Sequence, residues 1–291
     1  MRYKTVGLIG KPSHSATLAS LHVLIEELRL RNCNILLEHR IEEATQDSSI
    51  DVCSMQEIGE KAELAIVVGG DGYMLGAARV LAGYPIEVVG VNRGNLGFLT
   101  DINPEDISRQ LAHIFADEVQ REERFLLEAQ VLSNNKLQST HMAVNEIVLH
   151  HSKVAHMMEF ELYIGDAFVF SQRSDGLIIA TPTGSTAYSL SGGGPILMPH
   201  LDAIALVPMF AHALSSRPIV VDANADIRLK ISLKNGDNVQ ISCDSHVMIS
   251  LAPGDEVLIK KSPNKLNLVH PKDYSYFNVL RTKLNWGSKL F

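Results

Sequence analysis

Residues 69–72, Gly-Gly-Asp-Gly, combine a backbone suited to phosphate binding with one acidic side chain. They follow the apolar run 64–68 (LAIVV), which is typical of a buried strand. Glycine-rich turns after such strands let backbone N–H groups approach a phosphate, and the next helix directs its positive end to the same place. A carboxylate there would repel a phosphate. Two interpretations follow: Asp71 is only a turn residue, or its charge is part of the chemistry.

Three further segments contain residue types that bind ligands. Taken alone, the loop 92–101 (NRGNLGFLTD) is explained as an ordinary strand-to-helix connection. The pair Asn145-Glu146 lies inside the strand candidate 143–149 and, taken alone, is explained as a solvated strand end. Residues 171–195 are richer, because they gather Arg173, Asp175, hydroxyl side chains and three consecutive glycines around one apolar strand. Hydroxyls and open backbone amides bind ribose, phosphate and adenine edges, so this segment favours function over a flexible linker.

Composition excludes several classes of protein. The chain has 291 residues, of which 46% are hydrophobic and 20% are charged, so it can bury a hydrophobic core. Its formal charge of −7 argues against sequence-independent binding to nucleic acid. Its three cysteines form no CxxC pair, which favours a reducing, cytoplasmic compartment over a disulfide framework. No signal peptide or membrane-spanning run is predicted. The histidines at 150, 151 and 156 lack metal-binding HExxH spacing, and no protein metal ligand is predicted.

The order of predicted elements indicates two domains. In residues 1–120, strand candidates at 5–9, 34–38, 64–68 and 86–91 alternate with helices, one of them at 74–82. This alternation predicts βαβ units, a mostly parallel sheet and ligand binding beyond the carboxyl ends of its strands. In residues 121–269 the hydrophobic period becomes two, as in the alternating segment 158–164, and turn residues separate short strands. This part is predicted to be all-β. A final helix within 270–291 is predicted to return to the first domain.

The motifs together resemble those of the bacterial NAD kinase family, over essentially the whole chain. The matching motifs, in chain order, are GGDG at 69–72, NE at 145–146, TPTGSTAY at 181–188 and CDS at 243–245. The resemblance implies a Rossmann-like α/β domain followed by a β-sandwich-like domain. It also implies ATP-dependent phosphorylation of the adenosine ribose 2′-hydroxyl of NAD to give NADP, with a divalent cation, Mg²⁺, held largely by the triphosphate. A homo-oligomer, either a dimer or a tetramer, with no membrane or nucleic-acid partner is expected.

The resemblance also implies roles for individual residues. Asp71 matches the family's proton acceptor and Gly72 its neighbour in the NAD site, while Asn145 and Glu146 match the pair that holds ribose hydroxyls. The other matching positions, all expected to lie against the dinucleotide, are His156, Arg173, Asp175, Thr186, Ala187, Tyr188, Ser189, Leu190, Ser191 and His246.

Two alternatives to this function stay open. A lipid kinase that shares the GGDG loop would need an apolar groove or a basic amphipathic helix, and neither is predicted. A non-catalytic NADP(H)-binding sensor would have little use for a carboxylate at position 71.

Tyr73 stands where a small or polar residue that caps the following helix is expected, and a Tyr side chain does not cap.

Overall fold

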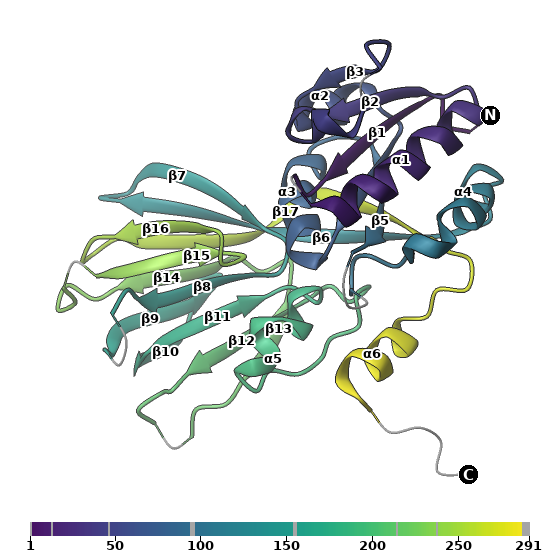
Figure 1. Ribbon diagram of the computed structural model, residues 1–291. Helices are drawn as coiled ribbons and strands as arrows, with labels where there is room; N and C mark the ends of the chain where they lie inside the picture. Colours follow the sequence, from purple (N-terminus) through teal and green to yellow (C-terminus); the bar gives the residue numbers. More distant parts are fainter. Residues whose placement is uncertain are drawn as a thin grey trace, which may run out of the picture. The chain divides into compact units, whose positions relative to one another are not determined.

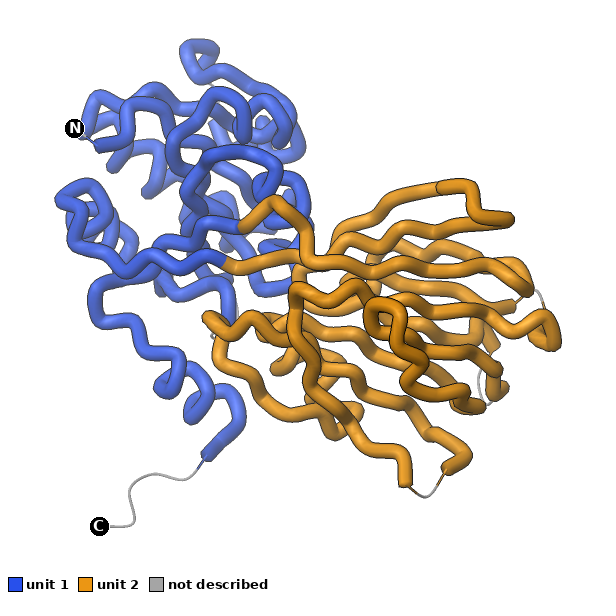
Figure 2. The backbone as a smooth tube through the Cα atoms, turned by 180° about the vertical axis from the view of Figure 1, so that it is seen from behind, with its two compact units in different colours: residues 1–123, 266–291 blue, residues 124–265 orange. Residues whose placement is uncertain are grey.

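The computed structural model describes residues 2–286 apart from 13, 46, 94–96, 154–155, 214 and 237. The chain divides into two compact units, shown in different colours in Figure 2. Unit 1 comprises Met1–Glu123 and Leu266–Phe291, and unit 2 comprises Arg124–Lys265. Among the helices of the described part, none has the length and hydropathy needed to cross a lipid bilayer.

Unit 1 is built on a parallel sheet whose strands run in the order β3-β2-β1-β4-β5, with the end of β17 beside β5. Successive strands are joined by helices, as expected for parallel pairing (Figure 1). The strands are β1 (Thr5–Gly10), β2 (Asn34–Glu38), β3 (Asp51–Cys53), β4 (Leu64–Gly69), β5 (Glu87–Asn92) and β17 (Glu256–Pro271). The helices are α1 (Ser15–Leu30), η1 (His39–Ala44), α2 (Met55–Lys61), α3 (Asp71–Leu81), η2 (Pro104–Asp106), α4 (Ile107–Phe115) and α6 (Tyr276–Leu284).

Helices bury both faces of this sheet. Leu21 and Leu24 of α1 and Leu111 of α4 join one core cluster with alternate residues of the strands. On the other face, Ile58 of α2 lies against Gly7 of β1. Strands covered on both sides are apolar throughout, and every residue of β4 is buried.

Unit 2 consists of two mainly antiparallel sheets. One has the order β13-β12-β11-β8-β15-β16, and the other contains β10-β9-β14-β17 with β6 and β7 attached. The strands are β6 (Val119–Ser133), β7 (Lys136–Ala143), β8 (Glu146–His151), β9 (Met158–Ile164), β10 (Ala167–Ser174), β11 (Gly176–Ala180), β12 (Ala203–Met209), β13 (Ile219–Asp222), β14 (Ile227–Ile231), β15 (Val239–Cys243) and β16 (Val247–Leu251). The short helical segments are η3 (Gly184–Thr186) and α5 (Tyr188–Ser191).

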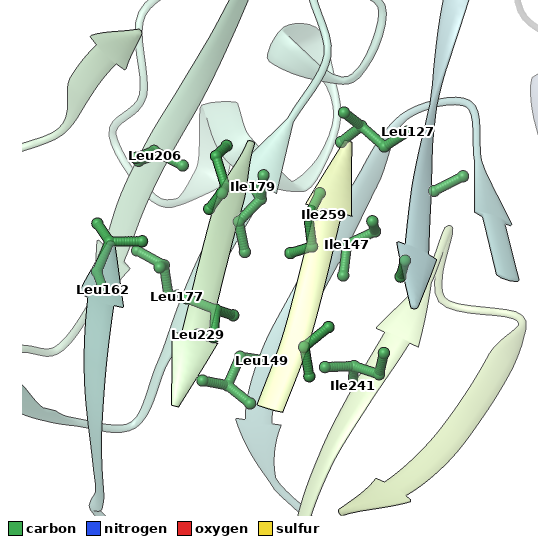
Figure 3. Packing of buried hydrophobic residues seen from close by; sticks show 14 of the residues in the cluster. Leu127, Ile147, Leu149, Leu162, Leu177, Ile179, Leu206, Leu229, Ile241 and Ile259 are labelled. Atoms are coloured by element: carbon green, nitrogen blue, oxygen red, sulfur yellow. The ribbon is translucent and has the colours of Figure 1, made fainter. Parts of the chain in front are cut away.

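The core of unit 2 lies between its two sheets. Figure 3 shows side chains of this cluster, with Ile147 and Leu149 of β8 on one sheet and Leu229 of β14 on the other. Val148, between the two β8 residues, instead joins a smaller cluster on the opposite face together with Leu197. This alternation is the packing of a β-sandwich, in which one face of each sheet forms the shared core.

The predicted fold class, an α/β part followed by a strand-rich part with a C-terminal helix grouped with the first, is confirmed. The elements that sequence periodicity missed are the short or half-exposed ones. In the edge strand β13, for instance, none of the four residues is buried. Without a buried face, such a strand has no alternating hydrophobic pattern to reveal it.

Candidate functional site

The GGDG loop joins β4 directly to α3. Gly69 ends the strand, Gly70 occupies the N-cap position with extended backbone, and Asp71 is already the first residue of the helix. The predicted helix over 74–82 therefore begins three residues too late. An acidic residue in the first turn interacts favourably with the helix dipole. The GGDG sequence therefore places its one charge beside the positive end of α3.

Tyr73 does not stand at the N-cap of α3, where the family pattern led us to expect a capping residue. Because α3 begins at Asp71, Tyr73 is its third residue, and the expectation of a side-chain cap there is wrong. Its half-buried ring lies under the guanidinium of Arg40, 5.6 Å from the ring centroid. Burial raises the pKa of the Tyr73 hydroxyl. Tyr73 is thus a packing residue beneath the loop.

The strand order places the GGDG loop at a topological switch point. The chain leaves β1 towards β2 and β3 on one side and returns to β4 on the other. The ends of β1 and β4 are adjacent, since the N–H of Lys11 donates to the carbonyl of Val68 at 3.3 Å. In open α/β sheets, ligands bind outside the carboxyl ends of the strands at such a point. Asp71 lies there, two residues beyond the end of β4.

The Asp71 carboxylate binds the loop that follows β5. Its Oδ2 accepts the N–H of Phe98 at 2.8 Å, and its Oδ1 accepts the N–H of Leu99 at 3.1 Å and the hydroxyl of Thr100 at 3.4 Å. Gly97 permits this approach, because a Cβ built there would lie 2.1 Å from Asp71 Oδ1. The reading of 92–101 as an ordinary connection was incomplete: its second half orients Asp71, while residues 94–96 lie outside the described part.

In unit 2, a buried carboxylate organises the Asn145-Glu146 pair. Asp244, which is 3% exposed, accepts the N–H groups of Val144 at 3.0 Å, Asn145 at 2.7 Å and Glu146 at 3.2 Å. The expectation that both residues of the pair lie within one strand is wrong. Asn145 lies in a bend and β8 begins at Glu146, because the three bonds to Asp244 hold the chain in a turn there.

The TPTGSTAY segment packs against the same bend. Thr181, just after β11, donates its hydroxyl to the carbonyl of Val144 at 2.7 Å and accepts the N–H of Gly184 at 3.1 Å. A Cβ built on Gly184 would lie 2.1 Å from the carbonyl oxygen of Asn145, so only glycine fits there. Tyr188 donates its backbone N–H to the carboxyl of Glu146. Two motifs that are far apart in the sequence thus form one structure.

A pocket of about 380 Å³ opens beside this structure in unit 2. Three of the predicted ligand-binding residues, His156, Asp175 and Tyr188, line it, together with Ser242 of β15. Tyr188 is 43% exposed, so its ring is available to a ligand.

The remaining predicted residues of unit 2 are not among those that line this pocket. Arg173 lines two other pockets, of about 310 and 480 Å³. Ser191 and His246 are exposed, and the Nδ1 of His246 lies 2.6 Å from the carbonyl oxygen of Asp244. Thr186, Ala187 and Leu190 are half-buried. Ser189 is fully buried, and its backbone carbonyl accepts the N–H of Gly194 at 2.9 Å.

Comparisons with known proteins identify the family. Profiles of the ATP-NAD kinase N-terminal and C-terminal domains match residues 6–119 and 144–271. The NAD kinase of Pseudoalteromonas translucida (strain TAC 125) is 59% identical over 297 residues, which covers 99% of this chain and 99% of that protein. The chain belongs to the ATP-NAD kinase family. The NAD kinase of Colwellia psychrerythraea (strain 34H) is 55% identical over 289 residues, with the same coverage of 99% of each chain.

Solved structures agree with this assignment at the level of the fold. Yeast NADH kinase, solved in complex with NADH, has a TM-score of 0.90 and 24% identity, covering 100% of this chain and 90% of that one. An NAD kinase from Archaeoglobus fulgidus, solved in complex with ATP, has a TM-score of 0.76 and 22% identity, covering 97% and 100%. The family predicted from GGDG, NE, TPTGSTAY and CDS is therefore confirmed.

In this member of the ATP-NAD kinase family, Glu146 is a buried carboxyl group with an unusual pKa. It is 3% exposed, and its Oε2 has no hydrogen-bond partner within the described part of the chain. Burial and the nearby charge of Asp244 raise the pKa of Glu146 to about 8, although the N–H of Tyr188 opposes the shift. At neutral pH the group is therefore mainly protonated. A neutral carboxyl group can donate a hydrogen bond as well as accept one, which suits it to a ligand hydroxyl.

The Glu146 pKa predicts how stability depends on pH. Its folded pKa of about 8 exceeds the ordinary value of 4.5, so the folded protein keeps a proton that the unfolded chain releases. This contribution to stability is complete below 4.5 and is lost as the pH rises to about 8. Relative to Glu146→Gln, the wild-type free energy of unfolding should fall by up to about 1.4 kcal/mol per pH unit in that range. Urea unfolding at several pH values measures this difference in the free energy of unfolding, with Glu159→Gln as a control for the loss of a carboxylate. Parallel curves for wild type and Glu146→Gln would contradict the assignment.

Two sets of residues in the site were missed by sequence reasoning. Asp244 lies inside the CDS motif, but no local signal shows that its carboxylate binds a bend a hundred residues earlier. The GFLT residues 97–100 were visible as a glycine-containing loop after a strand, yet their link to Asp71 depends on neighbouring strands of the sheet.

Within the described ranges, no three His, Cys, Asp or Glu side chains form a group that could hold a metal ion.

Proposed function

We propose that the protein transfers the γ-phosphoryl group of ATP to the 2′-hydroxyl of the adenosine ribose of NAD, producing NADP. The observation that carries the proposal is the position of Asp71: a carboxylate at a helix N-terminus and a sheet switch point, held in one orientation by residues 98–100. Family membership supports the choice of reaction, since relatives 55–59% identical over nearly the whole chain are NAD kinases.

In the proposed reaction, Asp71 accepts the proton of the attacking hydroxyl. Phosphoryl transfer needs the hydroxyl in line with the phosphate, and a positioned carboxylate can take its proton as the new bond forms. The first N–H groups of α3, at Asp71 and Gly72, have no acceptor within the helix and can bind phosphate oxygens. Gly72 is exposed, and a Cβ there would meet nothing within 4 Å, so a ligand can approach it closely.

We assign NAD binding mainly to unit 2. The bend at Asn145 and the protonated carboxyl of Glu146 are suited to ribose hydroxyls, and the exposed ring of Tyr188 offers an aromatic surface. The pocket lined by His156 and Asp175 would receive another part of the dinucleotide. Further proposed contacts come from Arg173, Thr186, Ala187, Leu190, Ser191 and His246, together with the backbone of Ser189.

The residues present fit a Mg²⁺ ion that is bound together with ATP. Mg²⁺ is commonly held through one or two carboxylates and the phosphates of a nucleotide, and it neutralises charge on the transferred group. At the switch point, the single carboxylate of Asp71 is the side chain that would face such an ion.

The direct test is NADP formation from NAD and ATP, with and without Mg²⁺. We expect turnover that requires both ATP and the cation. Phosphorylation of a diacylglycerol or a sphingoid base instead of NAD would identify a lipid kinase. Tight NADP binding without turnover at saturating ATP and Mg²⁺ would identify a sensor, and either result would refute the proposal.

Gly97→Ala tests the orientation of Asp71. The added Cβ would lie 2.1 Å from Asp71 Oδ1 and 2.2 Å from Thr100 Oγ1, so both side chains must move. Because displacing a reacting group by about 1 Å can cost roughly 10²-fold, we expect kcat for NADP formation to fall between about 10- and 100-fold. Circular dichroism and the unfolding midpoint should change little. A folded variant with normal kcat would contradict the proposed role of this loop.

We also propose that the protein forms a homo-oligomer and works in the cytoplasm. Large apolar side chains are exposed on unit 2, including Phe168, which is 57% exposed, and Val220, which is 48% exposed; both belong to edge strands. We propose that these edge strands take part in the association, because an unpaired strand edge is a site at which a second chain can pair. The three free cysteines fit a reducing compartment. Light scattering on the wild type and on Val220→Lys tests the association, and a monomeric wild type would refute it.

A further inference from the structure

The GGDG loop itself contains no basic side chain to bind phosphate. Residues 64–78 and residues 97–101 contain neither Lys nor Arg, and the P-loop lysine of other nucleotide-binding proteins is missing. Arg93, in the first part of the loop 92–101, donates a guanidinium N–H to the hydroxyl of Ser20. A triphosphate nevertheless carries several negative charges, and Asp71 adds another. The tertiary structure of unit 1 supplies a cation from the other end of the chain.

That cation is Lys283, on the C-terminal helix α6. Its Nζ lies 4.0 Å from Asp71 Oδ2 and 5.6 Å from the centroid of the Phe98 ring. The helix is positioned by its own local signals: Ser275 caps its N-terminus by accepting the N–H of Asn278, and Val279 and Leu280 are buried. Lys283 follows these two buried residues by four and three positions, so it projects from the same face of the helix.

The geometry of Lys283 indicates an ammonium that is available to an anion. At 4.0 Å the ion pair is longer than a hydrogen bond, and the side chain is 27% exposed. Both Asp71 oxygens already accept hydrogen bonds from residues 98–100, so the carboxylate does not depend on Lys283 for a partner. A loose, partly exposed ion pair adds little to stability. A lysine ammonium has three donors on a flexible stem, which suits it to phosphate oxygens.

We propose that Lys283 binds a phosphate group of ATP at the GGDG loop. The inference rests on the proposed function, because it assumes that a phosphoryl donor binds beside Asp71. In this structure the ammonium lies near both Asp71 and the Phe98 ring, and in the proposed complex it donates to a phosphate oxygen. Lys283 thereby supplies a positive charge directly beside the Asp71 carboxylate, which the GGDG loop itself lacks.

The test compares Lys283→Met and Lys283→Arg with Arg281→Met. The control removes an exposed cation two residues away on the same helix. Two quantities are measured: the Kd of ATP-Mg²⁺ by calorimetry without NAD, and kcat and KM for both substrates in NADP formation. For Lys283→Met we expect the Kd and KM of ATP to rise about 10- to 100-fold, as for a lost charge-assisted hydrogen bond. The KM of NAD should stay within about twofold. Lys283→Arg should recover most of the ATP affinity, and Arg281→Met should behave as wild type.

Other outcomes overturn the inference separately from the proposed function. Unchanged ATP binding in Lys283→Met would refute it while leaving the kinase assignment intact. Equal increases in the KM of ATP and NAD, together with a lower unfolding midpoint, would show that Lys283 only anchors α6. If the wild type makes no NADP, the proposed function fails, and the ATP titration still decides whether Lys283 binds a nucleotide. Should Lys283→Met not fold, the same titration of Lys283→Gln decides it.

Discussion

Asp71→Asn should lower kcat for NADP formation by at least about 10²-fold while NAD still binds. General-base catalysis by a positioned side chain contributes roughly 10²–10⁴ in rate, and an amide cannot accept the proton. The substitution has a second effect, because the amide NH₂ group would face either the N–H of Phe98 or the N–H of Leu99. The experiment must therefore separate loss of the base from disturbance of the loop.

Thr100→Val makes that separation. It removes the 3.4 Å hydrogen bond from the Thr100 hydroxyl to Asp71 Oδ1, keeps the carboxylate and nearly preserves the side-chain volume. We expect kcat to fall less than about 10-fold, because the two backbone bonds to Asp71 remain. Steady-state kinetics and NAD binding by calorimetry measure both variants. Near-normal turnover by Asp71→Asn would refute the proton-acceptor role, and an equal loss in both variants would assign the whole effect to loop geometry.

Asp244→Ala should cause the largest loss of stability. The substitution leaves three backbone N–H groups, at Val144, Asn145 and Glu146, without their acceptor in a buried bend. A buried donor without a partner costs about 1–3 kcal/mol, and bonds to a charged acceptor are at the upper end. Allowing for some relaxation, we expect the free energy of unfolding to fall by about 3–5 kcal/mol. NADP formation should be lost with it, because the bend carries Asn145 and Glu146.

Chemical denaturation measures this loss against two further variants. Asp244→Asn keeps one acceptor oxygen and should be intermediate between wild type and Asp244→Ala. Asp226→Ala removes a surface carboxylate that pairs with Lys260 at 3.2 Å, and such pairs contribute about 0–1 kcal/mol. If Asp244→Ala were no less stable than Asp226→Ala, the three hydrogen bonds would not stabilise the bend.

Hydrophobic periodicity predicted the elements with a strong local pattern. β1, β2, β4, β5 and β9 were located within one or two residues, because buried strands are apolar runs or strict alternations. The start of α3 was misplaced, because two glycines precede it and no side-chain cap marks it. Asn145 was placed inside a strand, because MAVNEIVLH reads as one apolar run although the chain bends in its middle.

The sequence by itself determined the family, the α/β and all-β parts, and the choice of Asp71 as the central residue. These features depend on motifs and local periods that can be read along the chain. The tertiary structure decided the surroundings of those residues: the 98–100 loop on Asp71, the carboxylate of Asp244 beneath Asn145, the burial of Glu146 and the approach of Lys283. Each is a contact between segments distant in sequence or a loss of solvent. Such contacts arise only when the sheets bring separate strands together, so no local pattern predicts them.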